Sequence, residues 1–421
     1  MRSRNALIAL AISFSVAISS TAFAAVKPGS ACSKLGSTSV LKGIKYTCIK
    51  SGKKLVWNKG ILIPVPKVTP TATPTPTPTP SASPSPAPSP SPSVTPTPTP
   101  TTNAEPVLLP TSFEDLFVRR AGIHLAAWQK GAEIIKANKS NVGTLEIVTG
   151  PNTKPYFDDY PLAIGNVSRL FPGRSEPTKT YVIRFKYVDA DWAEATLKSK
   201  LGINDFNWLN NNEGGKVILG RCDVARKNCN GAMQQTIFST GLSVIVQGVT
   251  NSDDPNDATG KLRFYSGMLE AHEYFHSLQR LPIMGKTNVW PHAWFREGSA
   301  EWVQNMAIFY QDFKTYVSYI KDDCYYDCPN LSEADIIEFL ETSKENYFLP
   351  KFQQFLNYSL GSRFIETLVA LKGPDTLIDM YAQMGKQLTF EQAFKNVYGV
   401  EWSYALPILA KTTYANLKEG R

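Results

Sequence analysis

The chain has 421 residues, of which 43% are hydrophobic, and its formal net charge is +8 at pH 7. Residues 1–67 contain nine lysines, two arginines and no acidic residue, so the rest of the chain is mildly acidic. A protein whose main function is to bind nucleic acid needs a basic face on its working domain, so we expect no nucleic-acid partner.

The first 24 residues have the pattern of a secretory signal peptide. Arg2 and Arg4 form a charged start, an apolar run covers residues 6–18, and Ala-Phe-Ala closes the segment at residues 22–24. This pattern predicts cleavage after residue 24 and a secreted protein that is extracellular or associated with the cell wall. No later stretch has about 18 consecutive apolar residues, so we expect no transmembrane span after cleavage.

Six cysteines remain after the predicted cleavage, and they fall into three pairs that are close in sequence. An even number of cysteines in an exported chain indicates disulfides. Six cysteines allow 15 connectivities, and proximity alone favours one of them. The favoured pairs are Cys32–Cys48, Cys222–Cys229 and Cys324–Cys328.

Residues 25–63 are predicted to form a small basic β module. Two strand-like runs flank a turn at Ser51-Gly52, which is the pattern of a β-hairpin, and so small a core needs a disulfide to fold. The segment resembles a basic Cys-pair module that recurs in secreted actinobacterial proteins. Its positive charge suits an anionic cell-envelope surface, although the solubility of a very small domain explains the charge equally well.

Residues 64–102 are rich in Pro, Thr and Ser, with proline at every second or third position. Such a segment stays near polyproline II and acts as a semi-rigid linker. The remaining residues, 103–421, are numerous enough to build a substantial core, and they form the predicted globular domain.

Within this domain, strand patterns come first and helical patterns follow. Thr111 and Glu114 have the spacing of a capping box, which predicts a helix over residues 112–138. We expect strands at residues 143–150, 180–188, 216–220 and 241–249, and a helix at 191–201. After residue 261 the pattern is almost entirely helical. This order predicts an α+β fold in which a mixed-sheet subdomain precedes a mostly helical one.

The stretch GMLEAHEYFHSLQRL contains His272, Glu273 and His276 in the arrangement H-E-x-x-H. On a helix, residues four apart lie on one face, so both imidazoles can reach one ion. Zinc takes such nitrogens in a tetrahedral shell and leaves one position for water. Glu273 is close enough along the helix to take a proton from that water. The pattern therefore predicts one catalytic Zn²⁺, but an amphipathic helix with two histidines remains the alternative.

A second helical stretch carries two acidic residues. The residues WFREGSAEW, 294–302, place Glu297 and Glu301 one turn apart on one face. This stretch and the H-E-x-x-H motif together resemble the gluzincin zinc metallopeptidases, the superfamily of aminopeptidase-like and thermolysin-like enzymes. The resemblance implies that residues 103–421 form a gluzincin-like metallopeptidase domain. It also implies that Glu297 is the third zinc ligand and that Glu301 holds a zinc histidine by its other ring nitrogen.

The same resemblance extends to two other segments. The residues NYSLG at 357–361 resemble the Y-x-x-G helix of gluzincin aminopeptidases, which implies that Tyr358 stabilises the transition state and that Gly361 permits close helix packing. The residues GAMQQ at 231–235 resemble their G-x-M-E-N segment. Gln234 stands where the glutamate that binds a free amine would be, which favours endopeptidase over aminopeptidase activity.

Other zinc-peptidase readings fit less well. The metzincin motif needs Gly and His where this chain has Gln279 and Pro282. His292 precedes Glu297 by five residues and should point away from the zinc face. We also expect the strand at 241–249 to be a sheet edge that pairs with an extended peptide substrate.

The sequence thus predicts a secreted zinc-dependent hydrolase of peptide bonds, acting on a peptide or protein substrate through zinc-activated water with Glu273 as general base. The alternative is a catalytically inactive binding or structural protein of the cell envelope with a peptidase-like fold.

Overall fold

The structure is a computed structural model of the whole chain. It describes residues 30–32, 35, 38–41, 44–52, 54–59, 61–62, 107–154, 159–251, 263, 266–286, 289–324, 328, 330–342 and 352–421. The predicted signal peptide and the Pro-rich linker lie outside these residues. The chain divides into two compact units, Met1–Thr99 and Pro100–Arg421, and each is described by itself.

The first unit contains a small antiparallel sheet around the expected hairpin. Strands β2 and β3 pair across the Ser51-Gly52 turn, and Cys48 on β2 is disulfide-bonded to Cys32. Cys48 is almost fully buried, so the disulfide lies in the centre of this module. The strands are β1 Thr38–Leu41, β2 Ile44–Ser51, β3 Lys54–Trp57 and β4 Ile61–Leu62.

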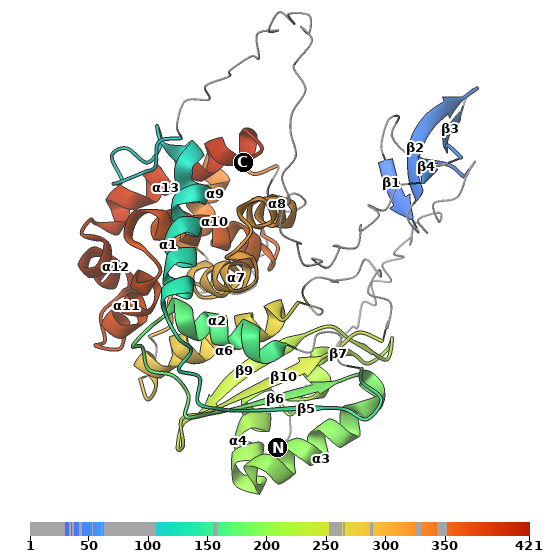
Figure 1. Cartoon of the computed structure of the whole chain (residues 1–421), viewed down its shortest axis with the longest axis vertical. Helices are drawn as coiled ribbons and strands as arrows, with labels where there is room; N and C mark the ends of the chain where they lie inside the picture. Colours follow the sequence, from blue (N-terminus) through green and yellow to red (C-terminus); the bar gives the residue numbers. More distant parts are fainter. Residues whose placement is uncertain are drawn as a thin grey trace, which may run out of the picture. The chain divides into compact units, whose positions relative to one another are not determined.

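The N-terminal half of the second unit contains a four-stranded mixed sheet in the order β5-β6-β10-β9 (Figure 1). The first three of these strands run parallel, and β9 is antiparallel to β10 at the edge. The predictions at 143–150, 180–188 and 241–249 are confirmed as β5, β6 and β10. The bounds are β5 Thr144–Thr149, β6 Lys179–Phe185, β9 Ala232–Ile237 and β10 Leu242–Gly248.

Two expectations about the sheet are wrong. Residues 216–220 form a turn that leads into the 3-10 helix η3, Leu219–Arg221, because Val217 and Ile218 bury their side chains under the sheet without joining a ladder. Strand β10 is internal, between β6 and β9, and the strands at the two edges are β5 and β9. The sequence of β9 is AMQQTI, and its two glutamines hide the strand pattern.

Helices cover both faces of the sheet, as Figure 1 shows. Alternate residues of the strands point to opposite faces, so Val182 and Ile245 join one core cluster and Ile183 and Val244 join the other. The first face carries α2 Tyr160–Leu170 and α6 Met268–Arg280, and the second carries α3 Ala190–Leu201 and α4 Ile203–Asn212. Strand β6 and helix α3 are joined by the 3-10 helix η2, Tyr187–Asp189.

The C-terminal part of the unit is helical, as expected, so the fold is α+β at the level of its architecture. The helix predicted at 112–138 begins later, because Thr111 bonds with Asp115 rather than Glu114 and residues 112–119 form turns. The helical elements are η1 Arg120–Gly122, α1 Ile123–Ala137, η4 Leu281–Ile283, α7 Ala293–Phe309, α8 Phe313–Asp323, α9 Glu333–Thr342, α10 Leu356–Lys372, α11 Asp375–Met384, α12 Phe390–Tyr398 and α13 Trp402–Lys418. None of the helices that the structure describes has the length and apolar character to cross a membrane.

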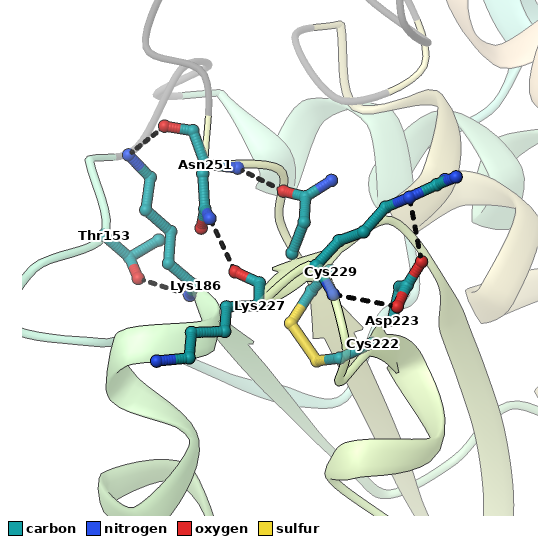
Figure 2. Close-up of a disulfide and its surroundings, with 9 residues drawn as sticks. Thr153, Lys186, Cys222, Asp223, Lys227, Cys229 and Asn251 are labelled. Atoms are coloured by element: carbon teal, nitrogen blue, oxygen red, sulfur yellow. Dashed lines mark hydrogen bonds and ion pairs between the residues drawn. A yellow bond between two sulfur atoms is a disulfide. The ribbon is translucent and has the colours of Figure 1, made fainter.

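All three sequence-local cysteine pairs form disulfides. Figure 2 shows the second, which joins β7 Cys222–Asp223 to β8 Asn228–Cys229 directly before edge strand β9. Asn251, which follows β10, donates a hydrogen bond to the side chain of Asn228 and another to the carbonyl of Lys227. The disulfide therefore closes the β7–β8 hairpin, and the hydrogen bonds of Asn251 hold the hairpin beside the end of β10. The hairpin in turn fixes the start of β9.

Candidate metal centre

Helices α6 and α7 bring three potential metal ligands together. The Oε2 atom of Glu297 lies 3.5 Å from Nε2 of His272 and 3.4 Å from Nε2 of His276. His272 and His276 are one turn apart on α6, and Glu297 lies on the second turn of α7. Of the described residues, only these form a group that can hold a metal ion, with one ligand atom from each and all three within 4.8 Å of one another.

The separations fit a tetrahedral ion. Two ligand atoms that each lie about 2.1 Å from such an ion are about 3.4 Å apart, which is close to both distances to Glu297. The donor set of two imidazoles and one carboxylate is one that zinc uses when a fourth position is kept for water. The three residues therefore fit zinc in both geometry and chemistry.

The other ring nitrogen of each histidine contacts a glutamine. Nδ1 of His272 lies 3.1 Å from the amide oxygen of Gln304 and 3.5 Å from a carboxylate oxygen of Glu301. Nδ1 of His276 lies 2.7 Å from the amide oxygen of Gln279. These contacts orient Nε2 of each ring toward Glu297. An Nδ1–H that donates to the amide oxygen leaves Nε2 without a proton, which is the tautomer that a metal site requires.

Gln279 also ties the two ligand helices to each other. Its amide group donates hydrogen bonds to the carbonyl of Arg296, at 2.9 Å, and to the hydroxyl of Ser299, at 2.8 Å. Gln304 in turn donates a hydrogen bond to Glu301. Sequence analysis missed both glutamines as parts of the site. The helical spacing from His276 to Gln279 and from Glu301 to Gln304 was the available signal.

The buried charges around the site depend strongly on one another. Burial alone would raise the pKa of Glu297, but His276, His272 and Arg296 hold it well below its usual value. Burial would lower the pKa of His272, but its hydrogen bonds to Glu297 and Glu301 outweigh that effect and raise the pKa to about 9. The two carboxylates therefore favour positive charge at the position of His272.

Tyr358 is brought to the site by two glycines. A Cβ atom on Gly298 of α7 would lie 2.3 Å from the carbonyl carbon of Gly361 on α10, so the two helices touch backbone to backbone. This is the close packing expected at Gly361. It stacks the ring of Tyr358 on that of His272, with centroids 5.6 Å apart.

The site opens into a cleft of about 880 Å³. Glu273 and Tyr358 line this cleft together with the three potential ligands, and Glu301 lies behind them, buried. One wall is the edge strand β9, including Gln234. Every site residue expected from the sequence is therefore in or directly behind one cleft.

Comparison with models of known families, with curated proteins and with solved structures finds no match for this chain. The site is therefore identified from the distances between its residues and from their spacing in the sequence.

Two other residues weighed in the sequence have different roles. His292 is buried among Trp294, Phe390 and Trp402 and contacts the carbonyl of Leu340, so it belongs to the aromatic core. The side chain of Gln234 donates hydrogen bonds to the hydroxyls of two residues of the sheet, Thr236 and Ser243.

Proposed function

We propose that the second unit is a zinc-dependent peptidase that cleaves within polypeptide chains, with His272, His276 and Glu297 holding the ion. The observation that carries the proposal is that both imidazole Nε2 atoms face one carboxylate oxygen at 3.4–3.5 Å on the wall of an open cleft. When bound, zinc would lower the pKa of water and polarise the carbonyl of the substrate.

Glu273 supplies the proton transfers. Its carboxylate lines the cleft and lies next to a ligand in the sequence, so it can accept a proton from the attacking water and deliver it to the leaving nitrogen. The hydroxyl of Tyr358 can donate a hydrogen bond to the oxygen on which negative charge develops. Proton transfer and stabilisation of the developing charge are then carried out by two residues that line the same cleft.

The walls of the cleft favour an extended polypeptide that is cut away from its N-terminus. Edge strand β9 lines the cleft, and an extended substrate can pair with its main chain. Among the lining residues that the structure describes, the carboxylates are those of Glu273 and Glu297, and both already have a task. No further acid is available there to bind a free amine, which supports endopeptidase over aminopeptidase activity.

Secretion and a cell-envelope location form part of the proposal. They rest on the signal-like sequence of residues 1–24 and on the three disulfides, which are typical of oxidising compartments. The basic first unit would then bind an anionic surface of the envelope.

The test uses the mature chain and compares it with Glu273→Gln. We expect about one zinc per chain in both proteins, because this substitution leaves the three ligands intact. Hydrolysis of an unfolded protein substrate should fall by at least about 100-fold in the variant. Glu194→Gln, the same chemical change at an exposed site on α3, is the matched control and should leave activity unchanged.

Two outcomes would overturn the proposal. Bound zinc with equal hydrolysis by wild type and Glu273→Gln would remove the proposed mechanism. Bound zinc with no hydrolysis by either protein would favour the inactive envelope protein.

A further inference from the structure

The cleft beside the ligands is lined by more cations than anions. Three arginines, Arg263, Arg280 and Arg296, share its walls with Glu273 and Glu297. Arg296 bonds to Glu297 at 2.8 Å, and Arg263 lies 3.7 Å from Glu301. Arg280 differs from both, because no carboxylate of the described residues lies within 4.0 Å of its guanidinium group.

Arg280 is held in place by an aromatic ring instead. Its Cζ atom lies 4.7 Å from the ring centroid of Trp290, and Arg296 approaches the same ring at 5.4 Å. Trp290 is 45% exposed and lines the cleft, so the pair is open to a ligand. A guanidinium that lies against a ring keeps the N–H groups of its edge available, and these match the two oxygens of a carboxylate.

The position of Arg280 relates it to the proposed reaction. It follows His276 by four residues on α6, so the two residues share a face. Their Cα atoms are separated by about 6 Å along the helix axis. An extended peptide advances about 3.3 Å per residue. A group that meets Arg280 would therefore lie about two residues from the bond that is cut.

We propose that Arg280, backed by Trp290, binds a carboxylate of the substrate about two residues from the scissile bond. The inference rests on the proposed peptidase function and adds a substrate class to it. The carboxylate is either an acidic side chain or the free C-terminus of a peptide. A hydrogen bond to a charged group of this kind should give roughly a 10- to 100-fold preference over an uncharged amide.

The experiment uses zinc-loaded mature protein and two matched sets of peptides. In the first set, four positions are varied one at a time, namely the two residues before and the two residues after the scissile bond. At the varied position, one peptide carries Glu and its partner carries Gln. In the second set, the peptide ends two residues after the scissile bond with either a free carboxylate or an amide. We expect a kcat/KM ratio of at least about 10 in favour of the carboxylate in one set, and that set identifies its source.

Variants assign the preference to Arg280. Arg280→Gln should bring the ratio close to one, mainly by raising KM for the carboxylate peptide, while the amide peptide is cut as before. Arg280→Lys should keep part of the ratio, because an ammonium group retains the charge without the planar fork. Arg226→Gln, at an exposed arginine of the β7–β8 hairpin, is the matched control and should keep the full ratio.

Failure of this proposal is distinct from failure of the peptidase function. If wild type cuts the peptides with a ratio near one in both sets, or if Arg280→Gln keeps the wild-type ratio, the role of Arg280 is overturned and the peptidase stands. If no peptide is cut, the peptidase function fails. Binding of the same peptides to Glu273→Gln by calorimetry then tests Arg280 without catalysis, and equal affinity for carboxylate and amide peptides overturns it.

Discussion

Helix α6 packs against the sheet on one side and against helix α7 on the other, and the two contacts are built from different chemistry. On the sheet side, Arg184 of β6 lies 3.2 Å from Glu270 of α6 and donates a hydrogen bond of 3.0 Å to Gln247 of β10. The side chains of Arg184 and Glu270 are both 0% exposed. A buried ion pair therefore connects α6 to the centre of the sheet.

On the helix side, amide and hydroxyl groups accompany the contacts of His272 and His276 with Glu297. Gln279 of α6 bonds to the backbone and a hydroxyl of α7. On another side of α7, Gly298 touches Gly361 of α10. The contact between α6 and α7 holds all three potential ligands, whereas the sheet side holds none. We infer that the ion pair with the sheet orients α6 as a whole, and that the hydrogen bonds of Gln279 to α7 set the distances between the potential ligands.

The largest expected effect comes from breaking the charged contact. Arg184→Leu leaves the carboxylate of Glu270 buried without its cation, which should lower the free energy of unfolding by about 3–5 kcal/mol. The double variant Arg184→Leu/Glu270→Leu removes both charges and should recover most of that loss. Urea unfolding of the two variants and the wild type measures the difference. A double variant no more stable than the single one would show that the pair contributes packing rather than charge balance.

The next effect comes from the glycine contact between α7 and α10. A methyl group at Gly298 would overlap the backbone of α10, so Gly298→Ala should lower the free energy of unfolding by about 1–3 kcal/mol and displace Tyr358. Gly165→Ala is the matched control, because a Cβ atom there would meet its nearest neighbour, Ser140, at an ordinary 3.5 Å. Replacing that helical glycine should be neutral or slightly stabilising. Equal unfolding midpoints for Gly298→Ala and wild type would contradict the backbone contact.

The helix side was the more predictable of the two from sequence. Helical geometry fixes the spacing of His272 and His276 on α6 and that of Glu297 and Glu301 on α7. How α6 and α7 meet depends on non-local packing, and only the family resemblance supplied that step. Gly361 was expected to permit close packing, but its partner Gly298 could not be named without the fold.

The sheet side was less predictable because pairing order and burial are non-local. Arg184 is a charged residue in strand β6, and charged side chains are rarely fully buried, yet its side chain has no exposed surface. The placement of β9 at the edge depends on which strands pair, and its two glutamines give no apolar alternation. The run at 216–220 is apolar enough for a strand but fills the core instead.

The smallest effect concerns the two glutamines that contact the histidines, and it separates their roles. Groups that bond to metal-binding histidines typically change metal affinity by 10- to 100-fold when they are removed. Gln279→Leu and Gln304→Leu should both weaken zinc binding in a chelator competition, whereas Gln311→Leu, at an exposed glutamine after α7, should not.

We expect the larger loss from Gln279→Leu. When Gln304 is removed, Glu301 still lies 3.5 Å from the same nitrogen of His272 and can replace it. Among the described residues, Nδ1 of His276 has no acceptor other than Gln279. The side chain of His276 is 16% exposed against 2% for His272, so its ring would turn more easily once Gln279 is removed. A larger loss of zinc affinity from Gln304→Leu would contradict this order. It would mean that the carboxylate of Glu301 does not replace Gln304 as the acceptor for Nδ1 of His272.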